Sequence, residues 1–124
     1  MAVQIHVEGH DGYTKAVDEN KGKTMFVLFS GSPSQNGESW CPDCVTAKPV
    51  VERNLQYVDK DAVFIHCGVG DRAFWKDPKN IFRTDPKLKL KSVPTLLRVG
   101  KPQRLEEEKC AKDDLVKMLF SDED

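Results

Sequence analysis

Two stretches, Met25-Phe26-Val27-Leu28-Phe29 and Trp40-Cys41-Pro42-Asp43-Cys44, decide the fold predicted for this chain of 124 residues. The first is a continuous apolar run that ends at Ser30-Gly31, which is typical of a buried central strand. In the second, Pro42 suits the first turn of a helix, where its missing N–H costs nothing. Apolar residues with helical spacing follow as far as Val58, so a long helix is expected after the strand.

The two cysteines of the second stretch carry the predicted chemistry. A Cys-x-x-Cys pair that follows a strand and opens a helix in a βαβ pattern indicates a redox pair. The helix start stabilises a thiolate through unpaired N–H groups and the dipole, whereas the Asp43 carboxylate disfavours one. We therefore expect Cys41 to be more acidic than a free thiol. We also expect it to be exposed at the helix tip as the nucleophile, with Cys44 beneath it as the resolving cysteine.

The pattern outside this centre predicts an α/β domain. Strands are expected at 3–7, 62–65, 93–99 and 103–107, and helices around 13–17, 72–75 and 115–120. The segment 80–92 has too few apolar anchors for an assignment. Early βαβ units give parallel strands, and a turn at 100–102 adds an antiparallel hairpin. We expect residues 1–124 to form one domain with a mixed five-stranded sheet and helices on both faces.

Composition and the N-terminal sequence narrow the function classes. Nineteen Lys and Arg against twenty Asp and Glu give a formal net charge of −1, so neither nucleic acid nor a membrane surface is expected as a partner. The N-terminal sequence lacks the basic start and apolar stretch of a signal peptide, and no run approaches transmembrane length. We expect a cytoplasmic monomer, in a compartment where structural disulfides are rare.

One group of basic residues has two interpretations. It comprises Lys87, Lys89, Lys91, Arg98, Lys101 and Arg104. Such a group is either an ordinary solvated surface or a docking patch for a partner.

Val93-Pro94 and Trp40 are the expected neighbours of the thiols. A cis-proline at the start of a strand would hold the Val93 backbone beside the Cys-x-x-Cys tip, where it could pair with an extended substrate. An ordinary proline at a strand start is the alternative. Trp40 either shields the thiols and packs against a substrate or fills the surface beside the loop.

A zinc site is the main alternative for the cysteine pair. Structural zinc needs four ligands, and His66-Cys67 is the only plausible complement in the chain. Because adjacent strand residues point to opposite faces, these two cannot easily reach one ion, and no metal is expected. Cys67 and Cys110 are expected to be buried structural residues, with Cys110 opening the last helix, and His66 to be a packing residue.

These motifs together resemble the thioredoxin superfamily, and within it the 14-kDa thioredoxin-related proteins. The resemblance rests on 39–44, the longer loop before it, 74–78 and 92–97. It implies a thioredoxin fold and a disulfide reductase without a bound cofactor, recharged by NADPH through thioredoxin reductase. The implied substrates are small disulfides such as cystine, nitrosylated or peroxide-oxidised thiols, and a narrow set of protein targets. The expected site residues are Cys41, Cys44, Trp40, Pro42, Asp43, Val93 and Pro94.

Two departures from ordinary thioredoxins bear on mechanism. Leu28 stands where thioredoxins usually carry a buried aspartate thought to handle the resolving cysteine's proton, and Asp43 is a candidate substitute. The loop Gly31–Ser39 should flank the site and could obstruct large protein substrates. The alternative function is a redox-gated binding module in signalling with little turnover.

Overall fold

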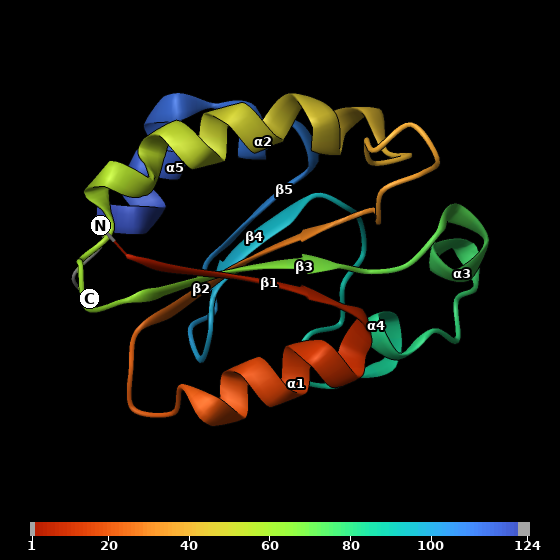
Figure 1. Cartoon of the computed structure of the whole chain (residues 1–124), viewed down its shortest axis with the longest axis horizontal. Helices are drawn as coiled ribbons and strands as arrows, with labels where there is room; N and C mark the ends of the chain where they lie inside the picture. The colour runs from red at the N-terminus through yellow and green to blue at the C-terminus, as the bar shows by residue number, and fades with distance from the viewer. Residues whose placement is uncertain (1, 122–124) are drawn as a thin grey trace.

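A five-stranded mixed sheet forms the centre of the computed structural model, which describes residues 2–121 (Figure 1). Its strands are β1 (Val3–Glu8), β2 (Met25–Ser30), β3 (Val63–Gly68), β4 (Thr95–Arg98) and β5 (Arg104–Glu106). Their order across the sheet is β1-β3-β2-β4-β5, with the first three parallel and β4 and β5 antiparallel to their neighbours. The predicted mixed α/β sheet is confirmed. Positions 1 and 122–124 of the expected domain lie outside the described residues.

Helices cover both faces of the sheet, as predicted (Figure 1). They are α1 (Gly9–Glu19), α2 (Pro42–Asn54), α3 (Arg72–Lys76), α4 (Ile81–Thr84) and α5 (Asp113–Ser121), with short 3-10 turns η1 (Leu55–Tyr57) and η2 (Glu107–Ala111). Figure 1 shows α2 and α5 on one face and α1 and α4 on the other. Within residues 2–121, no helix has the length and hydropathy of a membrane span.

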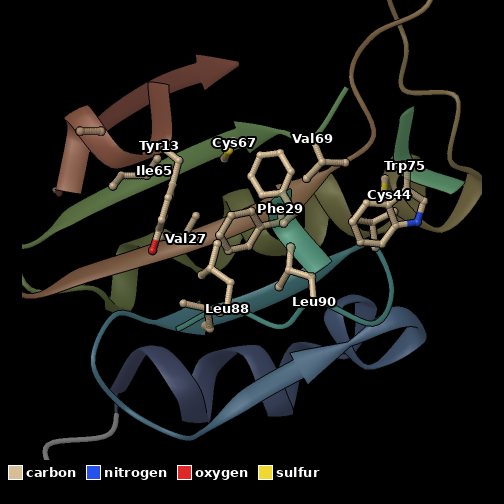
Figure 2. Close-up of a cluster of buried hydrophobic side chains, with 14 of the residues drawn as sticks. Tyr13, Val27, Phe29, Cys44, Ile65, Cys67, Val69, Trp75, Leu88 and Leu90 are labelled. Atoms are coloured by element: carbon tan, nitrogen blue, oxygen red, sulfur yellow. The ribbon is translucent and has the colours of Figure 1, made fainter. Parts of the chain in front are cut away.

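The sheet separates two apolar cores, and β2 contributes to both. All six residues of β2 are buried, which explains why its sequence is a continuous apolar run rather than an alternating one. On the α1 face, Phe29 lies 5.3 Å from the Tyr13 ring and 5.9 Å from the Phe82 ring, centroid to centroid. Figure 2 shows Phe29 within this cluster, with Cys44 and Trp75 toward one end. The candidate thiols are therefore part of a packed core.

Both late strands are shorter than predicted. The strand expected at 93–99 begins only at Thr95, after a cis peptide bond between Val93 and Pro94. Proline has no N–H for a ladder, and the Pro94 carbonyl accepts instead from the Glu107 N–H at 2.8 Å. The strand expected to reach Glu107 ends one residue earlier, because Glu107 adopts a left-handed φ of 56°.

Three helical details also differ from the sequence prediction. The unassigned segment contains α4, whose N-cap is Asn80, with a side chain that accepts from the Arg83 N–H. Cys110 lies in η2 rather than opening the last helix, although its predicted burial is confirmed. Val45 belongs to the apolar residues with helical spacing that were expected to form one buried face before Val58, but it is 37% exposed and lies outside that face.

Candidate active site

The Cys-x-x-Cys pair lies where α2 begins, beyond the carboxyl ends of β2 and β3. Cys41 is the N-cap of α2, with extended backbone angles, and Pro42 occupies the first turn as predicted. The Cys44 N–H donates to the Cys41 Sγ at 3.2 Å, and both cysteines are free thiols. The Cys41 sulfur therefore acts as the capping acceptor that a Ser or Asp side chain supplies in most helices.

This arrangement separates the pKa values of the two thiols. The pKa of Cys41 is lowered to about 7, chiefly because the Cys44 thiol donates to its sulfur, with the Cys44 N–H adding to the effect. Burial and the Asp43 carboxylate oppose the shift, as expected for a negative charge beside a thiolate. The pKa of Cys44 is raised, because it donates to Cys41 and is buried. The prediction of an acidic Cys41 is confirmed in direction.

The expected exposure of Cys41 is wrong. Its exposed fraction is 5%, against 2% for Cys44, and both belong to the apolar cluster that contains Phe29. The Cys41 thiol also lies within 3.6 Å of the Val93 carbonyl, to which it donates. The neighbouring backbone and the core thus cover the Cys41 thiol, an arrangement that residue spacing along the helix does not reveal.

Val93 and Pro94 lie beside the thiols as predicted. The Val93–Pro94 bond is cis, and the contact between the Cys41 sulfur and the Val93 carbonyl joins the helix start to this segment. Hydrogen bonds hold the segment in place, from the Thr95 hydroxyl to the Ser92 carbonyl at 2.7 Å and from the Glu107 N–H to the Pro94 carbonyl. A substrate backbone at Val93 would therefore lie next to Cys41.

Trp40 is fixed against the backbone rather than free on the surface. Its Nε1–H donates to the Gly70 carbonyl at 2.9 Å. A Cβ on Gly31 would lie 2.5 Å from the indole, so only glycine allows the ring to lie this close to the chain. Because Trp40 also packs against the cluster that contains both thiols, the structure favours the shielding interpretation.

The loop Gly31–Ser39 flanks the site, as expected, and hydrogen bonds tie it to Gly70, just after β3, and to Glu8 of β1. The Ser32 N–H donates to the Gly70 carbonyl at 3.0 Å, and its hydroxyl donates to Glu8 Oε1 at 2.6 Å. The Ser39 hydroxyl accepts from the Cys41 N–H at 3.1 Å. Sequence reasoning missed the parts played by Ser39 and Gly70, although the Gly-x-Gly after β3 could have indicated a close backbone approach.

A cavity of about 410 Å³ lies behind the thiols. Its lining includes Cys44, the loop Gly31–Ser39, His66 and Lys48. His66 packs edge-on against His6 at 5.0 Å, and burial lowers its pKa to about 4, so its ring is neutral near pH 7. Among residues 2–121, no group of three or more His, Cys, Asp or Glu is placed to hold a metal ion. The zinc alternative thus lacks a ligand set in the described part of the chain.

The pH dependence of alkylation should report the Cys41 thiolate. The rate with iodoacetamide should rise about tenfold per pH unit below a midpoint near 7 and level off above it, because only the thiolate reacts. Burial raises the pKa of Cys67 and of Cys110 to about 12, so these thiols contribute little. Asp43→Asn should move the midpoint lower, because it removes a charge that raises the pKa.

The matched control for this titration is Asp61→Asn, an exposed carboxamide substitution outside the site, which should leave the midpoint unchanged. A midpoint at or above about 8.5, the value of a free cysteine, would contradict the prediction. An upward shift in Asp43→Asn would contradict the assigned effect of the carboxylate.

The fold and the position of the two thiols together define a class of protein. The chain is a thioredoxin-like protein, because its mixed sheet has the order β1-β3-β2-β4-β5 and a Cys-x-x-Cys pair opens the helix that follows the central strand. This class supports a thiol oxidoreductase in general. Residues 6–122 match the family model described as 'Thioredoxin domain-containing protein 17-like, thioredoxin domain'. The chain therefore belongs to this family.

Curated relatives cover nearly the whole chain. Thioredoxin domain-containing protein 17 of Mus musculus is 51% identical over 120 residues, which is 97% of this chain and 96% of the mouse protein. The Homo sapiens protein of the same name is 47% identical with the same coverage. The family implied by the motifs is therefore shown.

Solved thioredoxins share the fold at much lower identity. The reduced thioredoxin pre-protein of Schistosoma mansoni superposes with a TM-score of 0.60 at 19% identity, covering 95% of this chain and 99% of that one. Oxidised thioredoxin O1 of Arabidopsis thaliana gives 0.59 at 21% identity, covering 95% and 98%. These likenesses confirm the thioredoxin fold.

Proposed function

We propose that this chain is a disulfide reductase in which Cys41 is the nucleophile and Cys44 the resolving cysteine. The observation that carries the proposal is the asymmetry of the pair, with the pKa of Cys41 lowered to about 7 and that of Cys44 raised. Near neutral pH, Cys41 is thus the thiol with a substantial thiolate fraction, and the thiolate is the nucleophile in disulfide exchange.

The reaction needs two exchange steps. The Cys41 thiolate attacks one sulfur of the target disulfide, so that a mixed disulfide forms and the other target sulfur leaves as a thiolate. Cys44 then loses its proton and attacks the Cys41 sulfur. The Cys41–Cys44 disulfide forms and the second target sulfur leaves, so the dithiol gives up two electrons in all. When Cys41 is bonded to the target, its charge no longer raises the pKa of Cys44, which helps the second step.

The surroundings of the pair suggest how substrate and proton are handled. The Val93 backbone beside Cys41 would pair with an extended segment, while Pro94 and Trp40 shape the approach. Pro42 presents the helix start that favours the thiolate. Asp43, next to Cys44 in the first turn, is the candidate acceptor for the Cys44 proton, since Leu28 cannot take it.

The oxidised pair would be returned to the dithiol by NADPH through thioredoxin reductase, with no cofactor bound to this chain. Small disulfides such as cystine, nitrosylated or peroxide-oxidised thiols and a narrow set of protein targets are the proposed substrates, acted on by a cytoplasmic monomer. The loop Gly31–Ser39 is anchored beside the site, where it would narrow the approach for large substrates.

Coupled turnover tests the proposal directly. With NADPH, thioredoxin reductase and cystine, absorbance at 340 nm should fall steadily in proportion to added protein. A protein disulfide should be reduced more slowly under the same conditions, because the loop restricts its approach. The double variant Cys41→Ser, Cys44→Ser should match the blank.

Two results would contradict this prediction. Equal rates with cystine and the protein disulfide would show that the loop Gly31–Ser39 does not restrict the approach of large substrates. If neither cystine nor the protein disulfide supported turnover, the reductase proposal would be overturned. That result would favour a redox-gated binding module, whose partner binding should persist in the double variant.

A further inference from the structure

A groove on the α1 face lies far from the thiols and takes no part in the proposed reduction. It has a volume of about 790 Å³ and is bounded by α1, the segment 85–88 and the β4–β5 hairpin. Figure 1 shows the hairpin turn near α1, at the opposite end of the sheet from the start of α2. The short helices α3 and α4, of five and four residues, contribute no residue to its lining.

The groove combines an apolar floor with a basic rim. Val17, Leu88, Leu97 and Val99 supply the floor. The Arg98 guanidinium lies over the Phe26 ring, on the other face of the sheet. The rim carries four basic residues, Lys21, Lys87, Lys101 and Arg104. Its two carboxylates are already engaged, Asp18 with Lys21 at 3.0 Å and Asp85 with His10 at 2.8 Å. Four basic residues against two carboxylates give the rim an excess of basic side chains on a chain whose net charge is −1, as a site for an anion requires.

The Tyr13 hydroxyl is an independent sign of a ligand. Tyr13 lines the groove with only 8% of its surface exposed, and its hydroxyl makes no hydrogen bond to residues 2–121. Every fully buried side-chain oxygen in residues 2–121 has a hydrogen-bond partner. Because the Tyr13 hydroxyl has none, it must be in contact with the open space of the groove. In Figure 2 the hydroxyl oxygen lies at the end of the ring away from Cys67.

A protonated donor at this place matches the charge of the rim. Burial, with smaller contributions from Cys67 and Asp85, raises the pKa of Tyr13 to about 12, so the hydroxyl keeps its proton near pH 7. Because this hydroxyl makes no hydrogen bond within residues 2–121 and has access to the groove, it can donate to a ligand acceptor without breaking a hydrogen bond of the fold.

We propose that this groove binds a small amphipathic organic anion, with an aromatic or alkyl group on the apolar floor and a carboxylate, sulfonate or phosphate between the basic rim and the Tyr13 hydroxyl. The volume lies in the range of ordinary small-molecule sites, which pair an apolar lining with a few placed polar groups. A bare inorganic anion would leave the apolar floor in water, and an uncharged apolar molecule would leave the rim and the hydroxyl unused.

Binding of 8-anilinonaphthalene-1-sulfonate to the reduced full-length protein tests this site. We expect saturable binding of one molecule, with amide chemical-shift changes confined to α1, the segment 85–88 and the hairpin. Lys87→Glu with Lys101→Glu should weaken binding about tenfold or more, because two attractive charges become repulsive. The matched control, Lys60→Glu with Lys109→Glu, makes the same charge change on exposed residues outside the groove and should bind as the parent does.

Two further comparisons separate the anion site from general adhesion of the dye. The uncharged analogue N-phenyl-1-naphthylamine should bind at least about tenfold more weakly, and Tyr13→Phe should weaken the sulfonate without affecting this analogue. Equal affinity for both molecules, equal effects of the two double variants, or shifts spread over the whole sheet would each overturn the proposal.

Discussion

Cys44→Ser is expected to convert the protein from a turnover catalyst into a trap for its substrates. The Cys41 thiolate still attacks the target disulfide, but no second thiol remains to release the mixed disulfide. Coupled turnover should fall to the blank, while mass spectrometry under non-reducing conditions shows a covalent adduct. With cystine, the adduct should add one cysteine unit to the protein and disappear on treatment with dithiothreitol.

Two matched variants make this result specific to the arrangement of the thiols. The serine hydroxyl can still donate to the Cys41 sulfur, as the Cys44 thiol does in the parent. Cys44→Ala removes this donor, which should raise the pKa of Cys41 and slow adduct formation near pH 7. Cys41→Ser should form no adduct with cystine, because the remaining Cys44 thiol is 2% exposed and its burial still raises its pKa when the Cys41 thiol is absent.

The pattern of adducts decides the roles of the two cysteines. Trapping by Cys41→Ser but not by Cys44→Ser would reverse them. Equal rates of adduct formation in Cys44→Ser and Cys44→Ala would show that the hydrogen bond from Cys44 does not activate Cys41.

The sequence was sufficient for the parts of the fold that local patterns encode. The apolar run of β2 predicted a strand buried on both faces, and the spacing of Cys41, Pro42 and Cys44 predicted the start of α2. Both depend on residues adjacent in the chain. The position of Val93-Pro94 beside the thiols was also predicted, from a proline at the start of a strand whose cis form would hold the Val93 backbone there.

The features that the sequence did not predict depend on contacts between distant segments. The burial of Cys41 and the anchoring of Trp40 by the Gly70 carbonyl join parts of the chain that no periodicity connects. The helix α4 was missed because four residues give no period, and its N-cap Asn80 is the only local signal. The groove bounded by α1, the segment 85–88 and the β4–β5 hairpin was not predicted either, because segments distant in the sequence form it.

Phe29→Ala is expected to lower the free energy of unfolding by a large fraction of its total. Phe29 is 0% exposed, and its ring lies between those of Tyr13 and Phe82 on the α1 face of β2. Replacing a buried phenylalanine with alanine costs about 3–5 kcal/mol, from lost apolar burial and the cavity that remains. A domain of this size has a total stability of only about 5–15 kcal/mol, so the variant should be close to unfolding.

Thermal and urea denaturation measured by circular dichroism would check this expectation, with a fall in melting temperature of roughly 10–20 °C. The matched control is Phe74→Ala, the same chemical change at a side chain that is 44% exposed, which should cost less than about 1 kcal/mol. Similar losses in the two variants would contradict the packing described here. Because Cys41 and Cys44 belong to the same cluster as Phe29, the truncation should also speed alkylation of the buried thiols, by raising the population of opened states.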